Sequence, residues 1–405
     1  MLDVVFLSRV IPPDVKDEVL SKRKGTMSES GESLQWKIIE GLDANLNHPV
    51  KMMNYLPVQS YPTSYDEPYI RRREFSHTEG ACDVCLPFLN VKYIKRIFMG
   101  GSLYKEIKEW ARSDAENEKV IISYSLIPEF TKAIAIAKNI NPGIKACAIV
   151  ADLPEYTVLT NSIDWSTRIY LNWMKKKTNM QLEKIDYFVL LTEPMAERLV
   201  THQKYIVMEG ISSKFPVEAE QTTGSGGKRR IIYAGTLNER FGVMNLVKAF
   251  TQMTDPSFEL VICGIGDSEQ TIKEIAKQDP RIVFMGQLKR EQVLQEMVKA
   301  CVIVNPRPDG EEFTKYSFPS KNLEALSSGI PFVGYKLAGI RDEYDAYINY
   351  PIDESSEGLA QILMDVGLDR DGAYRAKAIA AQKWVDENKN NLKQTARILD
   401  MIEVQ

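Results

Sequence analysis

The chain of 405 residues has ordinary hydrophobic and charged fractions, 44% and 26%, and a formal net charge of −4 at pH 7. This length predicts roughly two domains, and the charge gives no reason to expect nucleic acid as a partner. No apolar run reaches the roughly eighteen residues of a membrane-spanning helix. The N-terminal stretch is too short and too acidic for a signal peptide and is interpreted as a first buried strand.

Short apolar runs alternate with helical patterns in the first half of the chain. The predicted strands lie at 4–7, 120–123, 147–150, 187–191 and 205–208, and the clearest helices at 34–42 and 129–139. Near-continuous apolar strands separated by helices indicate a parallel sheet that is covered by helices on both faces.

Five cysteines are scattered along the chain, and this odd number favours a reducing cytoplasm over a disulfide framework. Cys82 and Cys85 form a single CxxC pair with His77 nearby. Structural zinc usually needs four ligands, and the sequence offers no second pair, so two ordinary thiols are the better interpretation. We expect no metal and no cofactor.

The second half repeats the alternation after a polar, glycine-rich stretch at 212–230, which is interpreted as a linker. Its predicted strands lie at 231–234, 259–263, 282–285, 302–305 and 331–334, and a long last helix at about 371–402 is interrupted near 386–391. Two such alternating runs indicate two doubly wound α/β domains. Gly264-Ile-Gly266 is only weak evidence for a dinucleotide site, because the rest of that fingerprint is out of order.

The segment 313–333 carries the most information about chemistry. It follows a buried strand and places Pro319, Ser320 and Lys321 at a predicted helix start, with Pro319 suited to the first helical position. Backbone N–H groups, the positive end of the helix dipole and a lysine would converge there, as in phosphate sites. Glu324, one turn later, could accept two hydrogen bonds from a vicinal diol such as a ribose. The pattern predicts a site for a nucleotide-diphosphate sugar.

The stretch 316–333 resembles the donor-binding signature of retaining family 4 glycosyltransferases with the GT-B fold, especially bacterial enzymes that build capsular and extracellular polysaccharide. The stretches 233–250, 261–267 and 282–287 resemble further strands and turns of that family, and 151–155 does so more weakly. The resemblance implies an α/β GT-B fold of two doubly wound, Rossmann-like domains whose parallel sheets face a central cleft. It also implies an acceptor-binding domain at 1–210, a nucleotide-sugar-binding domain at 211–385, and a last helix at 386–405 that returns to the first domain.

The same resemblance assigns roles in the second domain, where Gly235 ends a strand and donor contacts are expected. The family's arginine and lysine after this glycine are replaced by Thr236 and Phe241, so Arg240 is the cation expected to meet the diphosphate. Lys321 matches the family's phosphate-contacting lysine, and Glu324 matches the ribose-binding glutamate of its E-x7-E motif. The first glutamate of that motif is replaced by Tyr316, and Glu311 or Glu312 could take its place.

Three residues of the first domain are candidates with ordinary alternatives. Asp152 follows a strand and could orient the acceptor hydroxyl or the donor sugar, or could simply cap a helix. Glu209 could reach the cleft or only cap the linker. Gly31 could bring backbone N–H groups to the donor, although glycine and serine are also common at helix starts.

The sequence therefore predicts a cytoplasmic, retaining, hexosyl-type glycosyltransferase with catalytic roles for Asp152, Arg240 and Lys321. The donor would be a nucleotide-diphosphate sugar, with UDP favoured, and the acceptor a glycan or a lipid-linked glycan. The aromatic and basic stretch 165–177, with 71–73 and 92–96, could contact a membrane peripherally or be a solvated face. The alternatives are a nucleotide-sugar epimerase or hydrolase on the same fold, and a non-catalytic subunit that stabilises a partner enzyme.

Overall fold

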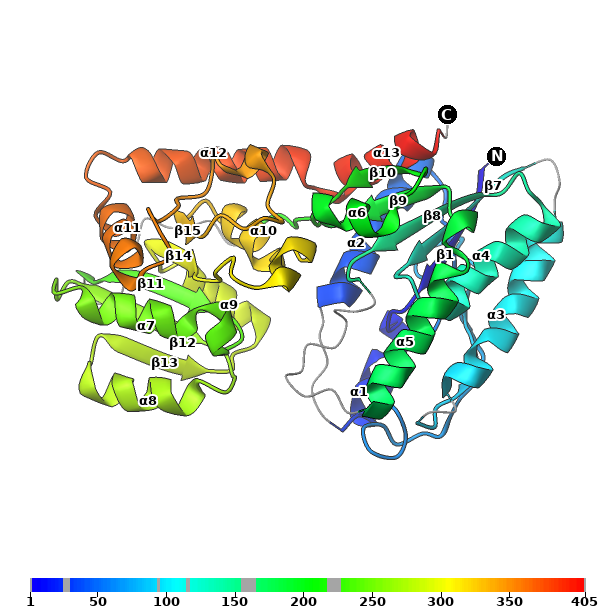
Figure 1. Ribbon diagram of the computed structural model, residues 1–405, viewed down its shortest axis with the longest axis horizontal. Coiled ribbons are helices and arrows are strands. Elements are labelled where there is room, and N and C mark those ends of the chain that lie inside the picture. The colour runs from blue at the N-terminus through cyan, green and yellow to red at the C-terminus, as the bar shows by residue number, and fades with distance from the viewer. Residues whose placement is uncertain are drawn as a thin grey trace. The chain divides into compact units, whose positions relative to one another are not determined.

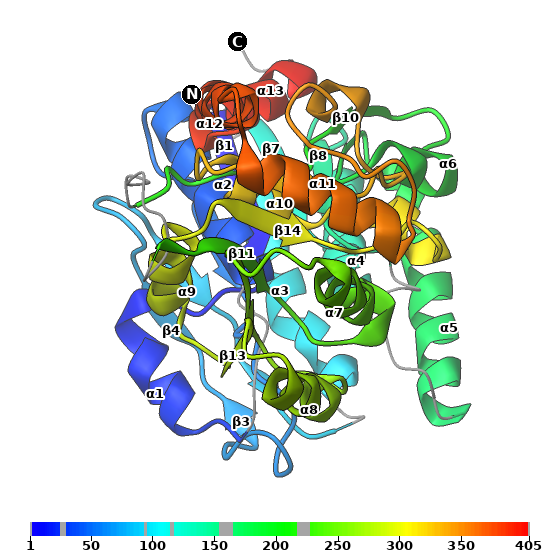
Figure 2. The ribbon, with the colours of Figure 1, turned by 90° about the vertical axis from the view of Figure 1, so that its left-hand side faces the viewer.

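The computed structural model describes residues 2–24, 30–92, 95–113, 117–153, 165–216 and 227–403. The chain forms two compact units. The N-terminal unit comprises Met1–Ile211 and Asn391–Gln405, and the C-terminal unit comprises Ser212–Asn390. Figures 1 and 2 show a sheet with flanking helices in each unit.

The N-terminal unit is built on a sheet of order β10-β9-β8-β7-β1-β2-β5-β4, in which neighbours are parallel except β4 and β5. The strands are β1 (Leu2–Ser8), β2 (Lys51–Asn54), β4 (Arg73–Phe75), β5 (Asp83–Cys85), β7 (Glu118–Tyr124), β8 (Lys145–Val150), β9 (Tyr187–Leu190) and β10 (Lys204–Val207). Two short strands, β3 (Tyr69–Ile70) and β6 (Phe88–Leu89), form a separate antiparallel pair.

Helices cover this sheet, and the last helix of the chain is one of them. They are α1 (Lys16–Ser21), α2 (Ser30–Leu46), α3 (Lys95–Arg112), α4 (Pro128–Ile140), α5 (Trp165–Asn179), α6 (Ala196–Leu199) and α13 (Asn391–Ile402). α13 lies beside α2 and over β9 and β10 (Figure 1). It buries Ile398, Leu399 and Ile402 in the core of this unit, so the hydrophobic effect holds the chain's end there.

The C-terminal unit contains a fully parallel five-stranded sheet of order β13-β12-β11-β14-β15. The strands are β11 (Arg229–Ala234), β12 (Phe258–Cys263), β13 (Ile282–Gly286), β14 (Val302–Asn305) and β15 (Phe332–Gly334). The helices are α7 (Val243–Gln252), α8 (Glu269–Gln278), α9 (Arg290–Met297), α10 (Ser320–Leu326), α11 (Ser356–Leu368) and α12 (Ala373–Asn388). α7 and α11 pack side by side, and α9 covers the other side of β11 (Figure 2).

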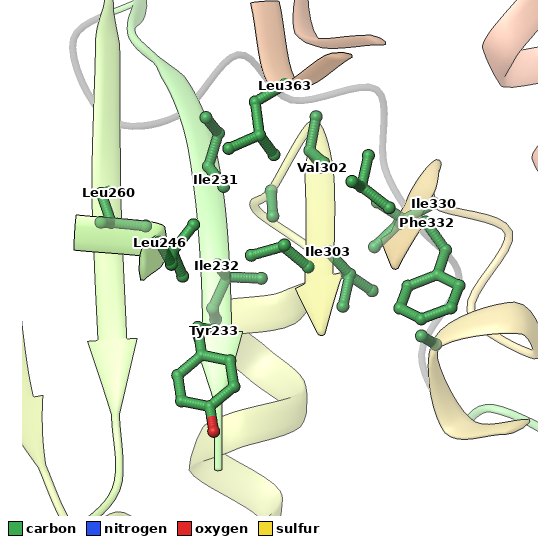
Figure 3. Close-up of a cluster of buried hydrophobic side chains, with 14 of the residues drawn as sticks. Ile231, Ile232, Tyr233, Leu246, Leu260, Val302, Ile303, Ile330, Phe332 and Leu363 are labelled. Carbon is green, nitrogen blue, oxygen red and sulfur yellow. The ribbon is translucent and has the colours of Figure 1, made fainter. Parts of the chain in front are cut away.

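The core of this unit lies between the sheet and its helices. Figure 3 shows apolar side chains of β11, β14 and β15 packed with Leu246 of α7 and Leu363 of α11. Tyr233 is the last large side chain of β11 in this cluster, and its hydroxyl points toward the carboxyl end of the strand. Because the chain crosses from one strand to the next by helices, the loops that follow β11, β12 and β14 gather at the same edge of the sheet.

The predicted α/β class with two Rossmann-like domains is confirmed, and every predicted strand range contains a strand. β2, β4 and β5 were not predicted, because each is short and contains a charged residue, so none of them forms an apolar run of its own. The second domain was predicted to end at 385, whereas the C-terminal unit continues to Asn390. The physical reason is that Val385 is fully buried in its core and α12 runs on to Asn388.

Candidate functional site

The loop after β11 is fixed by the loop after β12. Gly235 donates its N–H to the carbonyl of Cys263 at 2.9 Å, and Leu237 donates to Ile265 at 2.9 Å. Gly264 has φ +142°, and a Cβ there would lie 1.8 Å from the carbonyl oxygen of Gly235. Only glycine permits this approach. The Gly264-Ile-Gly266 pattern therefore serves packing between two loops, a role that its sequence did not reveal.

The backbone at Thr236 is also held by a hydrogen bond from a side chain of β11. Tyr233 donates its hydroxyl to the carbonyl oxygen of Thr236 at 2.9 Å, while the residue Thr236 itself is exposed. Two predicted donor-binding residues, Gly235 and Thr236, thus stand in a restrained turn at the carboxyl end of β11, the edge where doubly wound sheets bind ligands.

Lys321 joins the start of α10 to the end of β11. Its ammonium donates a hydrogen bond to the carbonyl oxygen of Ala234. The residue is exposed, but crowding around the charged group lowers the pKa of Lys321, and the nearby carboxylate of Glu324 opposes this lowering. α10 is also held to β14, because Asn305 Nδ2 donates to Asn322 Oδ1 at 2.7 Å.

Pro319 was predicted at the first helical position, and this was wrong. Its ψ of 102° lies outside the helical region, so Pro319 is the N-cap and the exposed Ser320 is the first residue of α10. The carbonyl of Pro319 accepts the N–H of Asn322 at 2.8 Å. The helix is also short, ending at Leu326, with Gly329 at φ +69° beyond it.

Glu324 lies beside Lys321 and has a partner that the sequence did not indicate. Glu324 Oε1 forms an ion pair with Nη2 of Arg290, the first residue of α9, at 2.7 Å. The arginine side chain is 61% exposed and the glutamate side chain 26% exposed. Ion pairs this exposed contribute about 0–1 kcal/mol, so ligand hydroxyl groups can replace Arg290 at little cost. Lys321 and Glu324 line a small cavity with Ala234 and Asn305.

Arg240 stands beside a second arginine that sequence reasoning missed. The guanidinium carbon of Arg240 lies 4.8 Å from the ring centre of Phe313, and that of Arg307 lies 4.7 Å from the same centre. Arg307 is 7% exposed. Burial, and then the charge of Arg240, lower the pKa of Arg307 to about 10. A lone arginine after a strand carries no sequence signal, so Arg307 could not have been singled out.

The short 3-10 helix Glu312–Tyr316 includes Tyr316, the residue at the position of the first glutamate of the E-x7-E motif. The side chain of Tyr316 is buried, with 7% of its surface exposed, whereas Glu311 and Glu312 are exposed. The carbonyl of Glu311 accepts the N–H of Thr314 at 3.0 Å, which fixes the turn. Glu311 and Glu312 are therefore the two carboxylates that this turn carries.

Gly31 and Asp152 both approach Tyr124 in the N-terminal unit. Gly31 is the second residue of α2, and a Cβ there would lie 3.6 Å from the Tyr124 hydroxyl. That hydroxyl is buried and has no hydrogen-bond partner among the described residues. Burial, and then the charge of Asp152, raise the pKa of Tyr124. Asp152 follows β8 and is exposed as a residue, yet crowding by protein raises the pKa of its carboxyl.

Glu209 and the region of His77 and the CxxC pair were also considered in the sequence. Glu209 follows β10 and is 2% exposed. His77 lies between the carboxylates of Asp43 and Asp83, at 2.8 Å and 2.6 Å, and Cys85 is a free, buried thiol. Within the described ranges, no three histidine, cysteine, aspartate or glutamate side chains are grouped so that they could hold a metal ion.

The surface of α5 combines apolar and basic side chains. Ile169 and Trp173 of α5 are exposed, and so are the run Lys175, Lys176 and Lys177 and, just after the helix, Met180. The side chain of Trp165 and residues 154–155 lie outside the described part of the chain. None of the helices in that described part is both long enough and apolar enough to span a membrane.

Comparisons with known proteins bear on both units. Residues 228–366 match the family described as Glycosyl transferases group 1. Among curated proteins, none matches the chain. Solved structures of similar fold include sucrose-phosphate synthase from Thermosynechococcus elongatus, with 16% identity over 99% of each chain and a TM-score of 0.63. They also include HepE from Anabaena in complex with UDP, with 13% identity over 100% of each chain and a TM-score of 0.61.

A third similar structure is the lipopolysaccharide outer core galactosyltransferase WaaB, with 13% identity over 99% of each chain and a TM-score of 0.63. At these identities the likeness concerns the fold, which is the GT-B fold. The family match and this fold together support glycosyl transfer, and the match covers the segments that carry Gly235, Arg240, Lys321 and Glu324.

Proposed function

We propose that this protein is a retaining glycosyltransferase that uses a nucleoside-diphosphate sugar, with UDP as the favoured nucleotide. The observation that carries the proposal is the pairing of Lys321 and Glu324 on α10, beside the end of β11 and inside the region that matches the glycosyltransferase family. A cation and a carboxylate on adjacent turns suit a phosphate and a ribose of the same nucleotide.

Each residue has a definite part in this proposal. When the donor binds, Glu324 gives up its ion pair with Arg290 and accepts hydrogen bonds from the two ribose hydroxyls. Lys321 and Arg240 attract the diphosphate, and this attraction strengthens as negative charge builds on the departing nucleotide. Asp152 has a raised pKa, so it suits proton exchange with, or orientation of, an acceptor hydroxyl. Retention of configuration and likeness to capsule-building enzymes rest on the sequence resemblance.

Titles of similar structures support UDP. HepE was solved with UDP and with UDP and glucose, and a pneumococcal O-GlcNAc transferase of similar fold was solved with UDP and GlcNAc. The acceptor is proposed to be a glycan or a lipid-linked glycan. A non-catalytic partner subunit is the second candidate, favoured by the buried Tyr316 at the place of a carboxylate. An epimerase or hydrolase is less favoured, because the chain has only three histidines for acid–base work.

The proposal is tested with the purified chain and a panel of nucleotide sugars. Ligands that bind only the folded protein raise its melting temperature, so one or more UDP-sugars should do so while the corresponding free sugars do not. Slow release of UDP, accelerated by an acceptor extract, would then identify a transferase. Donor binding without any turnover would favour the non-catalytic subunit, and no binding of any nucleotide sugar would contradict the proposal.

Activity is expected to survive EDTA. Lys321 and Arg240 can offset the leaving-group charge, a task that a metal ion performs in other transferases. The measurement is UDP release with excess EDTA, compared with the same assay containing magnesium or manganese. Complete loss of activity that either metal restores would show that the cations alone do not suffice.

Binding to anionic liposomes is expected at low salt and should weaken at high salt. Each lysine near such a surface contributes about 1 kcal/mol, which salt screens, whereas Trp173 adds an apolar part. Replacing Lys175, Lys176 and Lys177 by glutamine should reduce cosedimentation with liposomes and leave UDP-sugar affinity unchanged. Replacement of Lys105 and Lys108 on α3 is the control. A wild-type protein that ignores liposomes would speak against a peripheral location on the membrane's cytoplasmic face.

A further inference from the structure

Two arginines share one aromatic platform at the edge of the C-terminal sheet. Phe241 and Phe313 meet edge to face with ring centres 6.4 Å apart. The guanidinium carbons of Arg240 and Arg307 lie 4.8 Å and 4.7 Å from the Phe313 centre, and 5.2 Å and 5.8 Å from that of Phe241. Cation–π contacts hold both groups in place, but they do not neutralise two like charges.

The two guanidinium groups lack the partners that buried charges normally have. Nε of Arg240 and both Nε and Nη2 of Arg307 are buried without a hydrogen-bond partner in the described parts of the chain. Asp309 is near, but its Oδ1 accepts the Thr314 hydroxyl at 3.0 Å and the Ala338 N–H at 3.0 Å. Arg307 is buried and Arg240 is half-buried. Because a buried charge without a partner is costly, a site that keeps Arg307 beside a second cation suits an anion.

The backbone holds this arrangement before any ligand arrives. Gly242, which ends the turn carrying Arg240, has φ +80°, and a Cβ there would lie 1.9 Å from the carbonyl oxygen of Pro306. Pro306 directly precedes Arg307. The loops after β11 and β14 are thus pressed together at a glycine, and this contact sets the two arginines side by side.

The pair is separate from the cation on α10. Arg240 and Arg307 stack on Phe313. Lys321 instead donates to the carbonyl oxygen of Ala234, and the small cavity that it lines with Glu324 does not include either arginine. A nucleotide sugar whose ribose lies at Glu324 would place its first phosphate near Lys321, so the arginine pair suits an oxyanion farther along the donor.

We propose that Arg307 and Arg240 together receive an oxyanion of the donor beyond its nucleoside, either the sugar-linked phosphate or a carboxylate on the transferred sugar. Planar guanidinium groups with free N–H donors match both kinds of oxyanion. The inference rests on the proposed function, and it adds a specificity-determining residue, Arg307, that recognises the donor's second charge.

The test uses Arg307→Met, which keeps most of the side-chain bulk and removes the charge. If the phosphate is the ligand, UDP affinity should fall about tenfold or more, the scale of lost hydrogen bonds between charged groups, while UMP affinity stays unchanged. If a sugar carboxylate is the ligand, UDP and UDP-glucose should be unaffected and UDP-glucuronate should lose its affinity advantage over UDP-glucose. Unchanged affinity for all four ligands would overturn the inference.

Stability in the absence of ligand separates a binding role from a structural one. Arg307→Met removes a buried charge that repels Arg240, so the melting temperature should stay the same or rise. Functional residues are often less than optimal for stability. The matched control is Arg281→Met: Arg281 also stacks on a phenylalanine, Phe250, at 5.0 Å, but it is paired with Asp279 at 2.7 Å. That variant should lower the melting temperature and leave ligand affinity intact. A large destabilisation by Arg307→Met would mean that Arg307 is structural.

Two further arms keep this inference distinct from the proposed function. If Glu324→Ala weakens UDP binding but Arg307→Met does not, the proposed function stands and the inference fails. If the wild-type chain binds no nucleotide sugar of the panel, the proposed function fails, and pyrophosphate is then the probe. Protection of the wild type by pyrophosphate that Arg307→Met abolishes would still support an oxyanion site, and equal behaviour of the two proteins would not.

Discussion

Glu324→Ala should weaken UDP-sugar binding by about 1–3 kcal/mol, roughly 5- to 150-fold in Kd, because ribose hydroxyls lose a charged hydrogen-bond acceptor. Folding should be nearly unaffected, since the side chain's ion pair, with the exposed Arg290, is weak. Isothermal titration with UDP and with a UDP-sugar measures the effect.

Two further variants sharpen this result. Arg290→Ala removes the competitor for Glu324, so donor affinity should stay the same or rise slightly. Glu387→Ala, an exposed acid on α12, is the control for removing a carboxylate from this unit and should change nothing. Wild-type affinity in Glu324→Ala would show that the ribose is bound elsewhere.

Lys321→Ala should lower kcat by roughly 10²–10³-fold, the effect of removing one donor that stabilises transition-state charge. The rise in KM should be smaller, because the diphosphate carries more negative charge in the transition state than in the bound donor. Steady-state kinetics of UDP release separate the two parameters. A pure KM effect would mean that Lys321 only holds the ground state.

The pH dependence gives an independent check on Lys321. Dehydration lowers its pKa below that of an ordinary lysine, so the ammonium is fully present at low pH and is lost earlier as the pH rises. Wild-type activity should therefore fall on the alkaline side at a lower pH than an ordinary lysine would give. Lys321→Ala should lack this fall, and Lys277→Ala, on the exposed face of α8, should retain it.

The long buried strands were the easiest elements to predict, for a physical reason. β11, β12 and β14 are buried on both faces, so their sequences are almost continuously apolar. β4 and β5 are short and contain charged residues, Arg73 and Glu74 in β4 and Asp83 in β5, so neither forms an apolar run. The end of the C-terminal unit was also hard to predict. Val385 near that end is buried by residues from other elements, and a helical pattern in the sequence does not show such contacts.

Site residues could be predicted where their position within a helix, and that helix's position after a strand, are visible in the sequence. Lys321 and Glu324 fall at defined positions of a helix that follows a strand, so pattern and resemblance pointed to them. Arg290 and Arg307 come from other elements and reach the site only through the three-dimensional fold. The close approach of Gly264 to Gly235 is likewise a contact between loops, which no local pattern encodes.

A crystal structure of the protein with UDP would test the central claim most directly. The account predicts that the ribose hydroxyls contact Glu324 in place of Arg290. It also predicts that the diphosphate follows the loop after β11, with one phosphate at Lys321. UDP bound away from α10, or with its ribose facing a residue other than Glu324, would contradict the account.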